Sequence, residues 1–360
     1  MKYIKLGELC NIVSGGTPSR TKSEYWNNGT IPWIKIGNIK SKYVNEADEF
    51  ITEKGLQFSS AKLLPKGTLL YTIFATLGEC GILGIEACTN QAIAGLTIKE
   101  PENIFSEYIY YFLKSKKNDV TFLGRGVAQN NINLSMLRNF LVPVPSLTVQ
   151  NAIINLLAKA ECVIKLRKNE LELLDNLIKA RFVEVTKSST TEPTRMGDVA
   201  SYINGYAFKP SDWQQNGIPI IRIQNLNDKN ATYNHFNGTI NEKYRVRNGD
   251  VLVSWATHLE AYIWNGGDAW LNQHIFRVVF DKIPINKTYF VYSTEEALRQ
   301  AFKNAHGFKP TMEHIKRSDF ENAIINLPPV AIQEQFANFV AQIDKSKVMK
   351  RLRLSTISFC

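Results

Sequence analysis

The sequence predicts an α+β protein in which one mixed strand-and-helix domain occurs twice and two long helices form an antiparallel coiled coil. Three observations lead to this prediction. Short motifs recur in the same order in both halves, strand-like segments precede helix-like ones in each half, and each half ends in a helix with heptad spacing of its apolar residues.

The duplication is clearest in two stretches with a proline inside a strand pattern. They are "NGTIPWIKIGNI" at 28–39 and "NGIPIIRIQNLN" at 216–227. Apolar and polar residues alternate in both, as in a half-buried strand. Further pairs keep the same order: "IKLGELCNIVSGGTPSR" with "TRMGDVASYINGYAFKP", "PKGTLLYTIFA" with "RNGDVLVSWAT", "TNQAIAGLTI" with "LNQHIFRVVF", "GRGVAQNNI" with "AHGFKPTMEHI", and "VPVPSLTVQ" with "INLPPVAIQ". This repeat is too long for a solenoid and indicates a duplicated domain.

Each copy continues with an amphipathic helix, expected around 104–118 and 286–304. Each then closes with a strand that prolines terminate, at Pro145 in the first copy and at Pro328 and Pro329 in the second. Because proline lacks a backbone N–H and fixes its own φ, it ends the strand and sets the start of the closing helix.

The first closing helix is expected to be long, because neither glycine nor proline interrupts 148–185. At 1.5 Å per residue it would span roughly 57 Å. Steps of three and four define an apolar seam typical of a coiled coil, at Ile153, Leu157, Ala160, Ile164, Leu171, Leu174 and Ile178. The second closing helix repeats the seam at Ile332, Phe336, Phe339 and Ile343.

The second seam is expected to end early, since Ser346 and Lys350 occupy its next positions. An exposed seam needs a partner, so we expect the two helices to pack antiparallel, with the copies related by an approximate two-fold axis. The shorter helix limits the overlap to roughly 33 Å, close to the ~34 Å of one DNA turn. Alternatively, the seams serve oligomerisation and the match of lengths is coincidental.

The net positive charge of the chain suits a protein that binds a polyanion, but it is also explained by solubility alone. The 360 residues carry a net charge of +10 spread along the chain, which fits either a long polyanion or solubility alone. The five cysteines show neither C-x-x-C nor zinc-ligand spacing, so disulfides and zinc are not expected. No signal peptide or run of roughly 18 apolar residues is present, and a cytoplasmic location without a membrane span is expected.

Catalytic signatures are missing from the sequence. It contains no P-loop, no G-x-G-x-x-G and no G-x-S-x-G elbow, and "NLPPV" at 326–330 only faintly resembles an amino-methyltransferase loop. All five histidines lie in the second copy, so the copies cannot share a histidine mechanism. The duplicated residues are turn-formers and hydrogen-bonding groups, which indicates a binding protein and not an enzyme.

These motifs together resemble the specificity (S) subunit of type I restriction–modification systems, over nearly the whole chain. The resemblance depends on "SGGTPSR", "NGIPIIRIQNLN", "LNQHIFRV", the proline-rich strand-to-helix junctions and "LIKARFVEV", found in order. It implies target-recognition domains at 1–146 and 196–328, conserved helices at 147–186 and 329–360, and a linker at 187–195. The second helix is short or truncated compared with the family pattern.

The resemblance also implies function and partners. Each domain would read one half of a split double-stranded DNA sequence, and the chain itself would be non-catalytic. It would recruit two modification subunits, which bind S-adenosylmethionine and methylate adenine, and two restriction subunits, which use ATP and Mg. The helices would be docking surfaces for the modification subunits.

Candidate DNA-binding residues are polar or basic side chains and glycine turns in the strand-rich regions, since Lys and Arg contact phosphates, Arg reads guanine, and Asn or Gln reads adenine. In "SGGTPSR" the backbone N–H groups of two glycines could clamp a phosphate, although a structural turn is an equal alternative. The candidates in the first copy are Ser14, Gly15, Gly16, Thr17, Arg20 and Lys35. Those in the second copy are Tyr206, Lys209 and Arg222. Lys35 and Arg222 occupy matching strand positions and could either point to DNA or lie on a solvated face.

Loops that differ between the copies are the better candidates for specificity. They contribute Arg125, Gln129, Asn130, Lys309 and Thr311, and Thr257 and His258, which follow a strand that ends in tryptophan, could join them. Asn90–Gln91 and Asn272–Gln273 occur in both copies, which favours a structural role for them because shared residues cannot explain different half-sites.

Two other function classes stay open from the residues alone. One is a coiled-coil adaptor whose globular heads bind proteins and have no DNA role. The other is a self-contained nuclease or methylase, which would show activity by itself.

Overall fold

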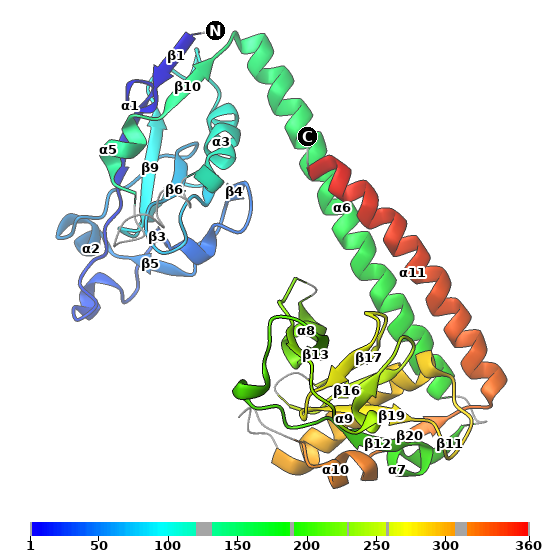
Figure 1. Cartoon of the computed structure of the whole chain (residues 1–360). Coiled ribbons are helices and arrows are strands. Elements are labelled where there is room, and N and C mark those ends of the chain that lie inside the picture. The colour runs from blue at the N-terminus through cyan, green and yellow to red at the C-terminus, as the bar shows by residue number, and fades with distance from the viewer. Residues whose placement is uncertain are drawn as a thin grey trace. The chain divides into compact units, whose positions relative to one another are not determined.

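A computed structural model describes residues 2–119, 132–187, 191–228, 230–256, 259–306 and 315–358 (Figure 1). The chain forms two compact units, Met1–Ile164 and Lys165–Cys360. The boundary falls inside the long helix α6 (Leu147–Thr186), so this helix contributes to both units.

The first unit is organised around one antiparallel-rich sheet with strand order β2-β9-β6-β7-β4. Its strands are β2 (Cys10–Ser14), β9 (Ile93–Ile98), β6 (Leu69–Thr72), β7 (Cys80–Leu83) and β4 (Tyr43–Val44). Helix α3 (Ser106–Ser115) covers the sheet and buries Ile109 and Leu113 in the same core as Tyr71. Shorter α-helices in the described part of this unit are α1 (Leu6–Leu9), α2 (Glu53–Gln57) and α5 (Leu134–Arg138).

A smaller sheet in this unit has the order β5-β3-β8. It contains β5 (Glu49–Ile51), β3 (Ile31–Ile34) and β8 (Cys88–Thr89), with β3 antiparallel to β5 and parallel to β8. A separate strand pair, β1 (Lys2–Lys5) with β10 (Leu141–Val144), brings the start of the unit beside the strand that leads into α6.

The second unit repeats this topology except at two sheet edges, where β4 of the first unit and β15 of the second have no counterpart. Its larger sheet, β12-β19-β16-β17, matches β2-β9-β6-β7, and its smaller sheet, β14-β13-β18-β15, contains the same antiparallel and parallel pairs around β13. The strands are β12 (Ser201–Asn204), β19 (Ile275–Val279), β16 (Val251–Ser254), β17 (Glu260–Ile263), β14 (Asn234–Phe236), β13 (Ile218–Ile221), β18 (Ala269–Leu271) and β15 (Arg245–Val246). The predicted duplication is therefore confirmed in the topology.

The flanking elements of the second unit follow the same plan. Strands β11 (Glu192–Arg195) and β20 (Ile324–Leu327) pair as β1 and β10 do. Helix α9 (Lys287–His306) takes the place of α3, and β20 leads into the closing helix α11 (Val330–Ser358). The shorter helices are α7 (Met196–Val199), α8 (Ile223–Asn227) and α10 (Arg317–Asn322).

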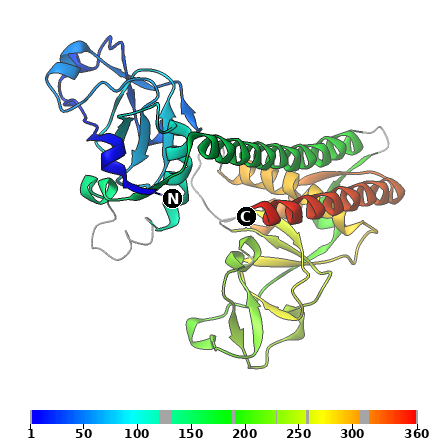
Figure 2. The same ribbon diagram turned by 90° about the horizontal axis from the view of Figure 1, so that it is seen from above.

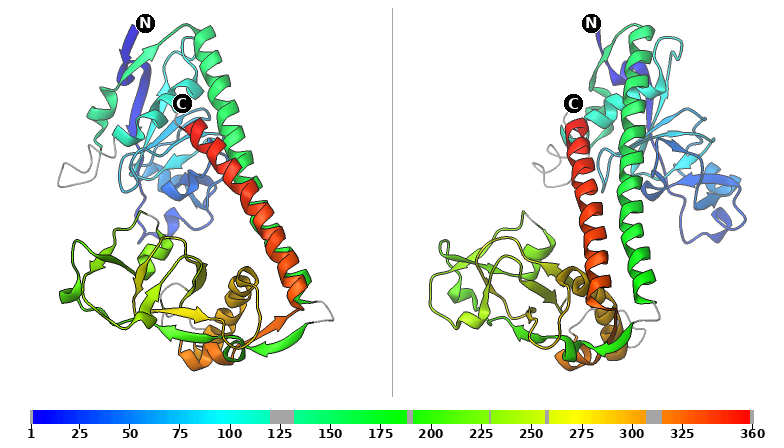
Figure 3. Two further views of the ribbon diagram at one scale, coloured as in Figure 1. Left: turned by 45° about the vertical axis from the view of Figure 1, so that its right-hand side comes forward. Right: turned by 90° about the vertical axis from the view of Figure 1, so that its right-hand side faces the viewer.

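Within the second unit, α11 lies alongside the C-terminal part of α6, as Figures 2 and 3 show from different directions. Phe182 of α6 packs against Phe336 of α11 and Tyr289 of α9, with ring centroids 5.6 and 5.5 Å apart, respectively. Ile178, Val185 and Val340 complete this buried cluster. The residue numbers rise in one helix as they fall in the other, so the pairing is antiparallel, as predicted. The two-fold axis between the repeats stays a prediction.

The apolar seam ends at Ile343, as predicted, but the contact between α11 and α6 continues beyond it. The helix continues to Ser358, and lysines replace apolar residues along it. The Lys347 side chain lies 2.6 Å from Asp175 of α6 and is only 10% exposed, and Lys350 forms an ion pair with Glu170. The long methylene stem of lysine lies on the apolar face while its ammonium group meets an acid on the other helix. Ion pairs therefore extend the contact between α6 and α11 beyond the end of the apolar seam.

Among the described residues, α6 is the one helix whose length and composition would allow a membrane crossing, with a window of mean hydropathy 1.3. A single such helix is weak support for a membrane span. The second half of α6 carries Glu170 and Asp175, whose ion pairs with α11 give this apolar helix a protein partner.

The charge pairing predicts a specific mutational result. Lys347→Glu places a third acid beside Asp175 and Asp344 and should lower the free energy of unfolding by about 1–3 kcal/mol. Lys345→Glu, on the exposed face of the same helix, should change it by less than about 0.5 kcal/mol. Thermal and urea unfolding measure both. Adding Asp175→Lys should restore part of the loss, and equal effects at 345 and 347 would contradict the interpretation.

Candidate nucleic-acid interface

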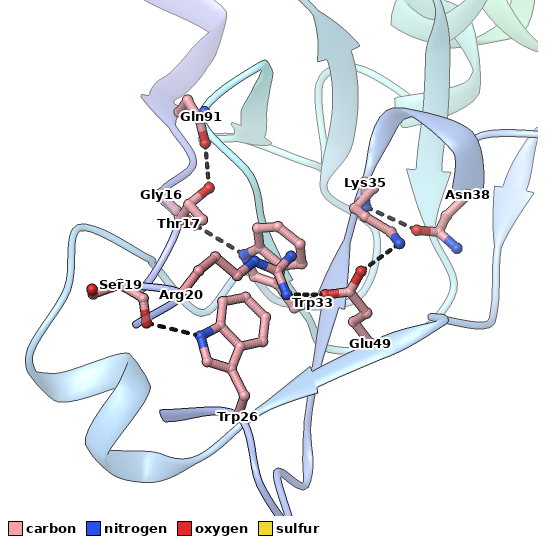
Figure 4. Close-up of polar contacts among 10 residues, drawn as sticks. All are labelled: Gly16, Thr17, Ser19, Arg20, Trp26, Trp33, Lys35, Asn38, Glu49 and Gln91. Atoms are coloured by element: carbon pink, nitrogen blue, oxygen red, sulfur yellow. Dashed lines mark hydrogen bonds and ion pairs between the residues drawn. The ribbon is translucent and has the colours of Figure 1, made fainter. Parts of the chain in front are cut away.

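A polar cluster surrounds the end of β3 in the first unit (Figure 4). Lys35 directly follows β3, and Glu49 lies on the neighbouring strand β5, opposite Trp33 in the antiparallel register. Lys35 Nζ lies 2.5 Å from Glu49 Oε1, and Arg20 Nη1 lies 2.5 Å from Glu49 Oε2. Strand pairing brings Lys35 to the Glu49 carboxylate, and the loop after β2 brings Arg20 to it.

Tryptophan holds the Arg20 guanidinium in place. Its Cζ lies 3.6 Å from the Trp26 ring centroid and 5.0 Å from that of Trp33. Both indole N–H groups are anchored, Trp26 to the Ser19 carbonyl at 3.1 Å and Trp33 to the Gly16 carbonyl at 2.9 Å. The Arg20 side chain is nevertheless 53% exposed. A planar guanidinium that is stacked and still exposed is well suited to a planar acceptor such as a base edge or a phosphate.

The cluster keeps a net positive charge at neutral pH. The hydrogen bond from Lys35 lowers the pKa of Glu49, partial burial opposes this, and Arg20 adds to the lowering. The carboxylate therefore stays ionised and orients both cations. Two cations against one carboxylate leave one positive charge, as an anionic ligand requires. No group of three His, Cys, Asp or Glu among the described residues could hold a metal ion.

The second unit places a related cluster at the same point of its fold. Arg222 directly follows β13, as Lys35 follows β3, and Asn234 takes the register position of Glu49, opposite Ile220. Arg222 Nη1 donates to Asn234 Oδ1 at 2.9 Å. Its Cζ lies 4.9 Å from the ring centroid of Trp213. Each unit therefore presents an arginine against a tryptophan, supplied from a different part of the repeat.

The backbone beneath the two clusters is the same. The Lys35 N–H donates to Asn38 Oδ1 at 2.9 Å, and the Arg222 N–H donates to Asn225 Oδ1 at 3.1 Å. In both units this asparagine stabilises the first turn after the strand. The backbone turn is constant while the partly buried side chains on it differ, which is the arrangement that two different ligand sequences would need.

Gly15 and Gly16 have packing roles that argue against the phosphate clamp. Their N–H groups donate to the carbonyls of Ile93 and Thr89, at 3.0 and 2.8 Å. A Cβ on Gly15 would lie 2.2 Å from Thr89 Oγ1, and one on Gly16 would lie 2.3 Å from the backbone of Ser60. Their N–H groups are thus not free for a phosphate, and the structural-turn alternative is the one that this geometry supports.

The hydroxyls of the same loop also bond internally. Ser14 Oγ donates to the carbonyls of Gly15 and Gln91, at 3.2 and 3.3 Å, and Thr17 bonds to the Gln91 side chain. The backbone N–H of Asn90 donates to the Ile34 carbonyl at 3.0 Å, which supports the structural role expected for this position.

The candidates in the second unit also include residues with internal contacts and a residue with an exposed side chain. The Tyr206 N–H donates to the Leu271 carbonyl at 2.8 Å, and its ring packs edge-on against Phe208 and Tyr244. Lys209 is exposed, and only its backbone is engaged, through a 2.7 Å bond to Asp212. Asn272 bonds through its backbone to Ile221 and Ile275, as a strand-end residue does.

Seven of the predicted residues lie outside the described part of the chain. They are Arg125, Gln129, Asn130, Thr257, His258, Lys309 and Thr311. Conversely, the sequence analysis did not single out Glu49, Trp26, Trp213 and Asn234. The β3–β5 and β13–β14 registers place Glu49 and Asn234. Trp26 and Trp213 lie at the ends of short helical turns outside these registers, so the folding of their loops brings them to the two arginines.

Comparison with known proteins agrees with the duplicated fold. The family model of the type I restriction modification DNA specificity domain matches residues 1–176 and again 188–355. The chain is 25% identical to the specificity subunit of the type I restriction enzyme MjaIX from Methanocaldococcus jannaschii, over 93% of this chain and 85% of the relative. It is 29% identical to the EcoR124I/EcoR124II specificity subunit from Escherichia coli, over 44% of this chain and 40% of that protein.

Solved structures share the fold. A chain from a type I restriction–modification system, solved for its complex assembly and conformational transition, matches with a TM-score of 0.65 at 17% identity. That match covers 99% of this chain and 94% of the other. The S subunit from M. genitalium matches with a TM-score of 0.52 at 13% identity, covering 99% and 93%.

The packing of Gly15 predicts that an added methyl group destabilises the first unit. Gly15→Ala would meet backbone oxygens of Thr89 and Asn90 that cannot move aside, and should cost about 1–3 kcal/mol of unfolding free energy. Gly37→Ala is a matched control, because nothing lies within 4 Å of its added Cβ. Urea unfolding compares the two. A stable Gly15→Ala protein with reduced DNA binding would instead favour the phosphate clamp.

Proposed function

Since the chain belongs to the family of type I restriction–modification DNA specificity subunits, we propose that each of its two repeats reads one half of a split DNA target. Specificity subunits are non-catalytic and act in complexes with methylase and restriction subunits and DNA. The missing catalytic signatures in the sequence agree with that role.

The observation that carries the proposal is the pair of equivalent clusters with different side chains. Arg20, Lys35 and Glu49 occupy one, and Arg222 and Asn234 the other. Arginine pairs bidentately with guanine, and asparagine with adenine, in the major groove. A lysine or arginine at either position also suits a phosphate. Different side chains on one backbone would give the two repeats different half-site preferences.

The remaining organisation follows from this assignment. Residues 1–146 and 196–328 would be the recognition domains, 147–186 and 329–360 the spacer helices, and 187–195 the linker. Two modification subunits would supply S-adenosylmethionine-dependent adenine methylation, and two restriction subunits would supply ATP- and Mg-dependent cleavage. Such a complex works on chromosomal DNA, which agrees with a cytoplasmic location.

An exposed apolar stripe on α6 supports the helices as docking surfaces. Leu166, Leu173 and Leu177 are 61%, 67% and 47% exposed and lie away from the seam that faces α11. Isolated exposed leucines are ordinary, but several on one helix face are typical of a binding surface. We place the modification subunit on this stripe.

The docking proposal predicts that Leu173→Lys weakens association with the modification subunit by about tenfold or more, because it buries a charge in an apolar contact. The variant should unfold at the wild-type temperature, since Leu173 is exposed in the free chain. Size-exclusion chromatography and titration calorimetry measure binding. If Leu173→Lys bound the modification subunit with wild-type affinity, α6 would not be part of the docking surface.

The half-site proposal predicts a position-specific effect of Arg222→Ala. Methylation by the complex should lose about 1–3 kcal/mol of discrimination at one base pair of one half-site. Methylome sequencing, followed by rates on duplexes with single base changes, measures this. Arg299→Ala is the control, because that arginine pairs with Glu295 and Glu296 on α9.

Two other outcomes would redirect the assignment. Equal loss on every sequence would make Arg222 a phosphate contact. The adaptor alternative would be favoured if wild-type chain with its modification subunit methylated no split motif and bound duplex DNA without a steep salt dependence.

A further inference from the structure

A buried glutamine lies in the first turn of each closing helix. Gln150 of α6 is fully buried, and Gln333 of α11 is 2% exposed. Neighbouring side chains at the start of both helices are largely exposed. A polar amide buried at such a place is costly unless its hydrogen bonds are made.

In the first unit, Gln150 ties three segments together. Its Oε1 accepts a 3.1 Å hydrogen bond from the Phe105 N–H, immediately before α3. Its Nε2 donates to the carbonyls of Asn103 and Pro145, at 3.2 and 3.0 Å. One side chain therefore fixes α6 to the start of α3 and to the turn after β10.

In the second unit, Gln333 makes the equivalent contacts. Its Oε1 accepts a 2.9 Å hydrogen bond from the Asn286 N–H, immediately before α9. Its Nε2 donates to the Pro328 carbonyl at 2.8 Å. The two glutamines thus have the same acceptor and donor roles in both repeats.

A tyrosine accompanies each glutamine. The Tyr108 hydroxyl on α3 donates to the Pro143 carbonyl of β10 at 2.7 Å. The Tyr289 hydroxyl on α9 donates to the Asn326 carbonyl of β20. Both rings are almost completely buried. In each repeat the tyrosine holds the strand that runs into the closing helix, and the glutamine holds the helix itself.

We propose that Gln150 with Tyr108, and Gln333 with Tyr289, are positioning residues that fix the direction in which each long helix leaves its recognition domain. They would thereby set the length of the unspecified gap between half-sites. The inference rests on the proposed function, because only a split target has a gap to set. Directional hydrogen bonds are the reason for an amide here, since an apolar contact of equal area tolerates sliding.

The length of the helices makes this direction consequential. A helix of 40 residues spans about 60 Å at 1.5 Å per residue. A change of about 5° at one end would shift the far end by roughly 5 Å, more than the ~3.4 Å that one base pair occupies along the DNA helix axis. A small loss of rigidity at the junction should therefore allow the complex to methylate duplexes whose gap differs in length from the native one.

The test measures methylation of duplexes with the native gap and with gaps one base pair shorter and longer, using the chain with its modification subunit. Gln150→Ala and Gln333→Ala should each reduce the ratio of native-gap to altered-gap rates by about tenfold or more, because they remove three and two buried hydrogen bonds, respectively. Asn151→Ala and Gln335→Ala are matched controls, because these exposed amides are on the same helices. The controls should keep the wild-type ratio.

Tyr108→Phe provides a variant that retains the packed ring and removes only the hydroxyl. It should shift the ratio in the same direction. If the variants slow methylation equally at every gap length, the residues stabilise the fold without setting the gap, and the proposal is overturned.

Hydrogen exchange distinguishes a failure of the glutamine clamp from a failure of the proposed function. The amide protons of Phe105 and Asn286 should exchange faster in Gln150→Ala and Gln333→Ala, respectively, whatever the chain binds. Unchanged exchange would overturn the clamp itself. A wild-type complex that methylates no split duplex, combined with accelerated exchange in the variants, would instead reject the proposed function and with it the role in gap length.

Discussion

The packing of α6 against α11 in the second unit is the contact on which the long-helix architecture depends. A long amphipathic helix is not stable in water by its own hydrogen bonds, because its apolar seam must be buried. Phe182, Phe336 and Tyr289 provide the buried part of this contact close to the sheet domain. Farther along, Lys347 and Lys350 replace hydrophobic burial with ion pairs across the helices. The same face is thus apolar at one end and charged at the other.

The chemistry of this interface changes along its length, and each part restricts the two helices in a different way. Aromatic packing close to the domain resists rotation, because the rings interdigitate with α9 as well as with both long helices. Ion pairs farther out favour the antiparallel register, because acids on α6 meet bases on α11. A like-charged register would place acids or bases against each other and is disfavoured.

The residues that both repeats share make internal contacts that stabilise the fold. The residues that differ between the repeats are the candidate ligand-binding groups. Gly15, Asn90 and Asn38 form internal hydrogen bonds or close backbone contacts, and their counterparts in the second unit do likewise. The cationic groups on that scaffold are not the same, since one unit has the exposed Arg20 and the partly buried Lys35, and the other has the partly buried Arg222. A duplicated fold requires the first kind of residue, whereas a protein with two different targets requires variation in the second.

The sequence by itself determined the duplication, the order of strands and helices, the helix seam and the family, because each depends on local spacing or on motifs contiguous in the chain. It also pointed to Arg20, Lys35 and Arg222, since charge next to a strand is visible locally. Only the tertiary structure decided their partners. Glu49 meets Lys35 through strand register, Trp26 meets Arg20 through a loop turn, and Gln150 meets Phe105 across 45 residues of chain. The physical reason is that such contacts arise from the closure of sheets and the docking of helices, and no local period encodes which distant backbone group lies within hydrogen-bonding distance.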